Sequence, residues 1–170
     1  MVACSEMIAH TASIEGRFCR SFPMYGSARR GAPVLAFAQI GPESGATRSM
    51  IYHPEYLLVL DPSMIGQADT LKGIQDDGTI IVNSTKSLQA ISDQLPDKEY
   101  RLGVLDATGI ASQIIGRPIP NSPMLGALAR VTGMFNLESI WKAIDERFPT
   151  VIAESNKKAA RVGYELVEYR

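Results

Sequence analysis

The segment SFPMYGSARRGAPVLAFAQI, residues 21–40, is the part of the sequence from which the fold and the site are best predicted. Residues 25–27 are typical of a turn, because glycine allows a positive φ and serine can hydrogen-bond the local backbone. Pro33 disfavours helical geometry in the residue before it and suits the first position of a strand. The apolar run at 34–40 therefore predicts a strand that is covered on both faces, as in a parallel sheet.

Two adjacent arginines, Arg29 and Arg30, lie between this turn and the strand. The turn and Pro33 predict a short, stiff loop that holds both guanidinium groups beside a buried strand. Paired guanidiniums suit a phosphate or a carboxylate, because their forked donors match two oxygens at once. A solvated pair, or an ion pair with a neighbouring chain, fits the same residues, so these alternatives stay open.

The composition favours a single cytoplasmic domain. A chain of 170 residues can bury one sizeable core and is too short for two comfortable domains. Its formal net charge of -1 implies no general affinity for nucleic acid or for an anionic membrane. The longest apolar runs are shorter than a membrane span, and the first residues lack the pattern of a secretory signal.

The sequence contains no pattern that predicts a catalytic or metal site. Cys4 and Cys19 form no CxxC pair, and two thiolates cannot supply the four ligands of an iron–sulfur cluster. His10 and His53 are the only histidines, and each is expected to be structural or at the surface. A reactive thiol is disfavoured. The residues therefore predict an α/β domain with an anion-binding loop, without a reaction.

The order of apolar and polar segments predicts a three-layer α/β fold, Rossmann-like, with a mostly parallel sheet, helices on both faces and a helical C-terminal part. We expect an initial helix, a short strand, then three strands alternating with three short helices. Three helices follow, and Trp141 lies on the apolar stripe of the second of them. The expected ranges are 2–15, 17–22, 56–61, 64–72, 79–83, 87–94, 100–106, 107–115, 121–133, a helix capped by Asn136, and 151–169.

Each of the three central strands is followed by a polar residue that can accept hydrogen bonds: Asp61, Asn83 or Asp106. Ligands and partners of open parallel sheets use this carboxyl edge. Such residues most often cap the helix that follows, and we favour capping for Asp61 and Asn83. For Asp106 and Thr108 a contact with a ligand or partner is left open.

Longer motifs carry a family resemblance. FPMYGSARRGAPV at 22–34, GRPIPNSPMLGALARVTG at 116–133 and LESIWKAIDERFP at 137–149 occur in this order along the chain. Together they resemble the gamma subunit of pyruvate:ferredoxin oxidoreductase (pyruvate synthase) and of its 2-ketoisovalerate relatives. The resemblance covers essentially the whole chain and implies one gamma domain over 1–170. Members of this family usually begin with a strand and a GRGGQG loop, so we expect that these two features are missing here.

The resemblance also implies a function. Enzymes of this family oxidatively decarboxylate a 2-oxoacid with thiamine diphosphate and magnesium, pass electrons through iron–sulfur clusters to ferredoxin, and release acyl-coenzyme A. This chain would bind none of these cofactors alone and would be active only with alpha, beta and delta-type subunits. The RRGAP form points to pyruvate or a branched 2-oxoacid.

In family members whose subunits are fused into one chain, the segment that matches residues 25–33 carries two basic residues that contact coenzyme A. By position these are Arg29 and Arg30, within a cofactor-binding segment that includes Tyr25 and Gly31. Two alternatives remain. The chain could be a purely structural assembly subunit whose arginines dock acidic groups of a partner, or a free module that binds a nucleotide or coenzyme A.

Overall fold

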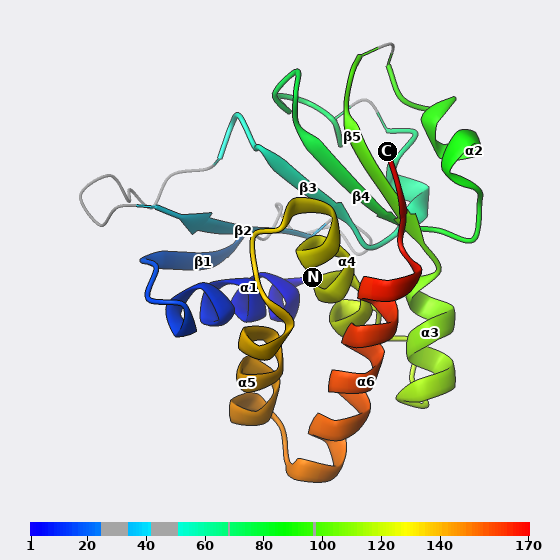
Figure 1. The fold of residues 1–170 in the computed structure, drawn as a ribbon. Coiled ribbons are helices and arrows are strands. Elements are labelled where there is room, and N and C mark those ends of the chain that lie inside the picture. Colours follow the sequence, from blue (N-terminus) through cyan, green and yellow to red (C-terminus); the bar gives the residue numbers. More distant parts are fainter. Residues whose placement is uncertain (25–33, 42–50, 68, 97) are drawn as a thin grey trace.

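The computed structural model describes residues 1–24, 34–41, 51–67, 69–96 and 98–170. It shows a four-stranded sheet, a separate two-stranded hairpin and a layer of helices (Figure 1). In chain order the elements are α1 (Val2–Ile14), β1 (Cys19–Met24), β2 (Leu35–Ile40), β3 (Tyr56–Val59), the 3₁₀ helix η2 (Pro62–Met64), β4 (Thr79–Asn83), α2 (Leu88–Ser92), β5 (Arg101–Leu105), α3 (Ala107–Ile114), α4 (Asn121–Thr132), α5 (Leu137–Arg147), α6 (Thr150–Leu166) and β6 (Glu168–Tyr169).

The four-stranded sheet has the order β3-β4-β5-β6. Its first three strands are parallel, and the register aligns Val59 with Val82 and Val82 with Val104. This confirms the predicted, mostly parallel sheet. Successive side chains of these strands point to opposite faces of the sheet. The apolar side chains of the two faces pack into two different hydrophobic cores.

Strand β6 is absent from the prediction, which extends the last helix to residue 169. Helix α6 ends at Leu166, and the chain then pairs antiparallel with β5. Leu102 and Arg170 exchange both backbone hydrogen bonds, each at 3.1 Å. The backbone N–H and C=O groups at the edge of β5 need hydrogen-bond partners. Pairing with them stabilises the last residues more than one further turn of α6 would.

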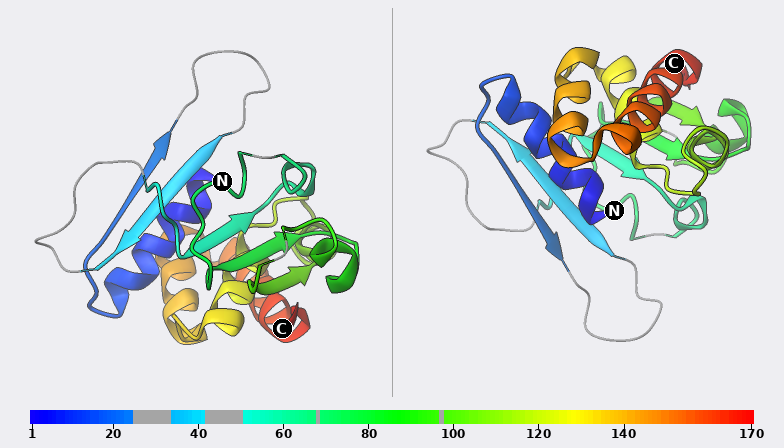
Figure 2. Two further views of the ribbon diagram at one scale, coloured as in Figure 1. Left: turned by 90° about the horizontal axis from the view of Figure 1, so that it is seen from above. Right: turned by 90° about the horizontal axis from the view of Figure 1, so that it is seen from below.

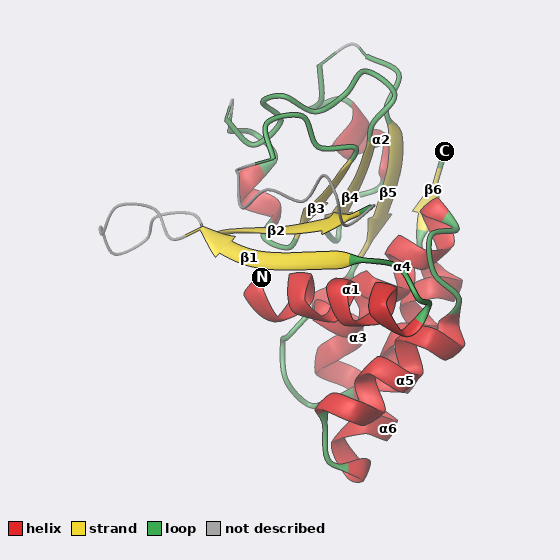
Figure 3. Cartoon of the chain, turned by 90° about the vertical axis from the view of Figure 1, so that its left-hand side faces the viewer, coloured by secondary structure: helices red, strands yellow, loops and turns green. Residues whose placement is uncertain are grey.

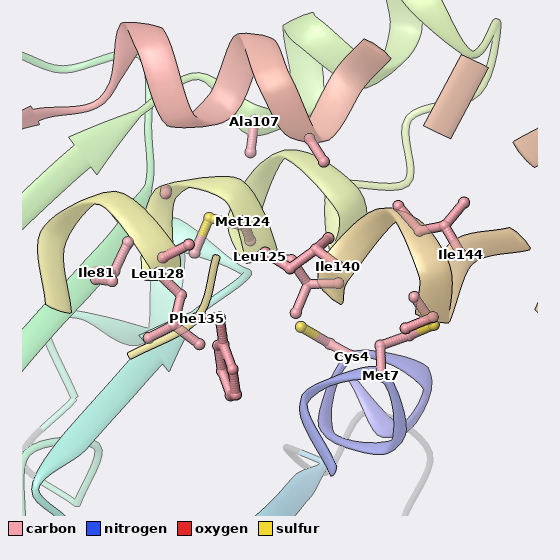
Figure 4. Close-up of a cluster of buried hydrophobic side chains, with 14 of the residues drawn as sticks. Cys4, Met7, Ile81, Ala107, Met124, Leu125, Leu128, Phe135, Ile140 and Ile144 are labelled. Atoms are coloured by element: carbon pink, nitrogen blue, oxygen red, sulfur yellow. The ribbon is translucent and has the colours of Figure 1, made fainter. Parts of the chain in front are cut away.

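The first core lies between the sheet and helices α1, α4, α5 and α6. Its side chains include Ile81 from β4, which lies near Leu128 of α4 in Figure 4. Cys4 and Met7 of α1 point towards Ile140 of α5 in the same view. The helical C-terminal part is thus confirmed, and it forms the main layer over one face of the sheet.

The second core covers the opposite face and contains Ile80, Val82, Leu102 and Val104 from the strands. Ile65, Ile74 and Ile91 pack over them from α2 and from the connection after β3. The described residues therefore place only the short α2, η2 and turns on this face. The full Rossmann-like layering, with helices on both faces, is not shown.

The predicted helix at 64–72 is wrong. Hydrogen bonds there run from residue i+3 to residue i, as from Gln67 N to Met64 O and from Thr70 N to Gln67 O, both at 3.0 Å. Gly66 and Gly73 lie within or next to this segment, and Gly73 adopts a φ of 82°. Glycine disfavours a regular helix, so the segment closes as 3₁₀ and turn structure instead.

The predicted environment of the strand at 34–40 is also wrong. This strand, β2, pairs antiparallel with β1 in its own two-stranded sheet, and most of its side chains are half-buried. Figure 2 shows the hairpin beside the four-stranded sheet rather than within it. One face of β2 packs on α1, and the other face carries large apolar side chains. Both faces are therefore apolar, and the sequence of β2 looks like that of a strand buried in a parallel sheet.

Several helix ends follow the predicted signals. Gly133 ends α4 in the left-handed conformation with a φ of 64°, and the Asn136 side chain accepts a hydrogen bond from Ser139 N at 2.8 Å. Asn121 is the first residue of α4 rather than its cap, which is Pro120. Trp141 is half-buried rather than fully in the core, and the Arg161 guanidinium lies 4.9 Å from its ring centroid.

Helices α4 and α6 approach each other backbone to backbone. A Cβ added to Gly126 would overlap the carbonyl oxygen of Ala160, and one added to Gly163 would overlap that of Pro123. Beside this contact, the buried Ser122 hydroxyl donates to Asn156 Oδ1 at 2.7 Å. The two glycines therefore fix the separation of the two helices.

We predict that Gly126→Ala destabilises the protein by about 3 kcal/mol, although alanine is the better helix former. The added methyl group must push apart two backbones that have no flexible side chain between them. Gly66→Ala is the matched control, because no atom beyond Gly66 and its two chain neighbours lies within 4 Å of the added Cβ. Urea unfolding of the two variants measures the difference, and a Gly126→Ala variant as stable as Gly66→Ala would contradict the tight contact.

Candidate functional site

The predicted cofactor-binding residues, Tyr25, Arg29, Arg30 and Gly31, all fall in residues 25–33, outside the residues that the structure describes. Their role stays a prediction. The structure does describe where this segment is attached: it joins β1 to β2.

The two ends of this connection are held side by side. Met24 and Leu35 are partners in the antiparallel register, so their Cα atoms are separated by only about 5 Å. The arginine pair therefore belongs to the connection of a β-hairpin. The strand that follows the pair belongs to this separate hairpin, and not to a buried parallel sheet as predicted.

Helix α1 anchors the hairpin. Figure 3 shows α1 lying along one face of β1 and β2. The Cys19 thiol donates to the Ala9 carbonyl, and the hydroxyls of Ser5 and Ser21 are hydrogen-bonded at 2.9 Å. Cys19 and Ile40 also pack against the first core. The base of the hairpin is thus fixed to the body of the protein.

Neither thiol of this region is a ready nucleophile. Complete burial raises the pKa of Cys4 to about 12, and partial burial is also the main cause that raises the pKa of Cys19. A thiol with a raised pKa is largely protonated at neutral pH, and the thiolate is the reactive form. This agrees with the expectation from the sequence that a reactive cysteine is disfavoured.

The carboxyl edge of the parallel strands has an internal network. The Asp61 carboxylate accepts hydrogen bonds from the Ser63 hydroxyl at 2.8 Å and from Ser63 N at 3.0 Å, and these bonds lower the pKa of Asp61. Asp106 accepts from Gly109 N at 2.7 Å and caps α3. The predicted capping by Asp61 is confirmed, and capping also accounts for Asp106.

Asn83 does not cap the helix that follows it, so that prediction is wrong. Its Nδ2 donates to Leu60 O and to Thr108 Oγ1, each at 2.8 Å, and its Oδ1 accepts from Thr108 N at 3.1 Å. The buried Asn83 thereby joins the end of β3 to the start of α3, while Ser87 caps α2. Its central strand position allows this bridge, which the sequence alone could not predict.

The two histidines have no shared site. His10 Nε2 lies 2.6 Å from Glu146 Oε2, which links α1 to α5, and His53 is exposed in the connection before β3. Among the described residues, no group of three or more His, Cys, Asp and Glu side chains could hold a metal ion. Within the same residues, no helix is long and apolar enough to cross a membrane.

Comparison with known proteins gives matches along almost the whole chain. The family profile described as pyruvate ferredoxin/flavodoxin oxidoreductase matches residues 1–166. The "Pyruvate/ketoisovalerate oxidoreductases common subunit gamma" of Pyrococcus furiosus is 40% identical over 98% of this chain and 90% of that protein. The "Pyruvate synthase subunit PorC" of Methanothermobacter thermautotrophicus is 39% identical over 98% of this chain and 89% of that protein.

Solved structures agree with these matches. The pyruvate oxidoreductase subunit PORC of Thermotoga maritima superposes with a TM-score of 0.85 at 38% identity, covering 99% of this chain and 90% of that one. The gamma subunit of a keto/oxoacid ferredoxin oxidoreductase from Geobacter sulfurreducens has a TM-score of 0.73 at 23% identity, which shows a shared fold. It covers 96% of this chain and 89% of that one.

The resemblance predicted from the three sequence motifs is therefore confirmed over nearly the full length, and the chain belongs to the pyruvate ferredoxin/flavodoxin oxidoreductase family, among its gamma-type subunits.

Proposed function

We propose that this chain is the gamma subunit of a cytoplasmic complex that oxidises pyruvate or a branched 2-oxoacid with ferredoxin as acceptor, and that it helps to form the coenzyme A site. The observation that carries the proposal is the near full-length match to gamma subunits, at about 40% identity. The relatives carry names for both pyruvate synthase and ketoisovalerate oxidoreductase, which supports a 2-oxoacid substrate.

Arg29 and Arg30 are the residues that we propose bind the phosphates of coenzyme A, with Tyr25 and Gly31 in the same segment. Paired guanidiniums match the oxygens of a diphosphate, and residues 17–40 of the sequence contain no Asp or Glu. The described ends of the segment, Met24 and Leu35, are held together in the hairpin. A fixed base reduces the conformational entropy that anion binding must overcome.

The rest of the chemistry belongs to other subunits in this proposal. The described residues supply no group of side chains for a metal and no activated nucleophile. Alpha, beta and delta-type partners would hold thiamine diphosphate, magnesium and the iron–sulfur clusters, and would pass electrons to ferredoxin. The part of this chain is to bind coenzyme A so that its thiol reaches an acyl group held by a partner.

We predict that Arg29→Ala/Arg30→Ala raises the KM for coenzyme A roughly a hundredfold or more in the assembled complex. Each charge-assisted contact contributes about 1.5–3 kcal/mol, and both are lost. The KM for the 2-oxoacid should change much less. Lys157→Ala/Lys158→Ala is the matched control, because it removes an adjacent pair of cations from α6. Steady-state kinetics with coenzyme A and pyruvate varied separately provide the measurement.

Gel filtration of the same variants separates this role from a structural one. If the arginines dock acidic groups of a partner, the double variant should fail to assemble, and whatever complex remains should keep its affinity for coenzyme A. An intact complex with an unchanged KM for coenzyme A would show that the pair does not bind its phosphates.

We also predict that the isolated chain has no oxidoreductase activity and that activity appears on addition of the partner subunits. The physical reason is that two cysteines cannot ligate an iron–sulfur cluster and that the described residues contain no group of side chains that could hold a metal ion. Ferredoxin reduction is followed with pyruvate and coenzyme A present, first with this chain alone and then with the partners. Reduction by the purified chain alone would refute the assignment as a dependent subunit.

A further inference from the structure

We draw no further inference here: the strongest candidate, the apolar face of the β1–β2 hairpin that carries Phe22, Leu35 and Phe37, belongs to neither hydrophobic core, and nothing among the described residues shows what covers it.

Discussion

The backbone contact between α4 and α6 is the constraint on which the other parts of the fold depend. Gly126 and Gly163 leave no space for a side chain, so the two helices behave as one unit. Val131 of α4 lies over Gly103 of β5, and Val167, just after α6, packs beside the same glycine. The position of α6 thereby determines where the chain leaves the helix and closes the edge of β5.

The hairpin is positioned through α1 rather than through the sheet. Met7 of α1 and Ile140 of α5 belong to the same core, and His10 with Glu146 links the same two helices at the surface. The small hairpin residues, such as Ala36 and Ala38, let β2 lie close to α1, which leaves the larger residues for the other face. A segment that the sheet does not bury is thus still held firmly at its base.

The sequence predicts the elements whose signals are local. The three parallel strands, the Gly133 end of α4 and the Asn136 cap follow from apolar runs, φ preferences and capping chemistry. Strand β6 and the Asn83 bridge depend on groups far apart in the sequence, which no local pattern encodes. The segment 34–40 was ambiguous for another reason: an apolar run results equally from a buried strand and from a strand with one face on a helix and large apolar side chains on the other.

The described polar groups at the carboxyl edge of the sheet form hydrogen bonds with neighbouring groups of the protein. Ligands of open parallel sheets bind at that edge when its side chains and helix ends are available. Here Asp61 bonds to Ser63, Asn83 joins β3 to α3, and Asp106 caps α3, so these groups stabilise the edge instead. The hairpin, by contrast, has large side chains outside both cores and a surplus of arginines. The polar groups of the sheet edge are thus bonded within the protein, while the hairpin keeps large apolar side chains outside both cores.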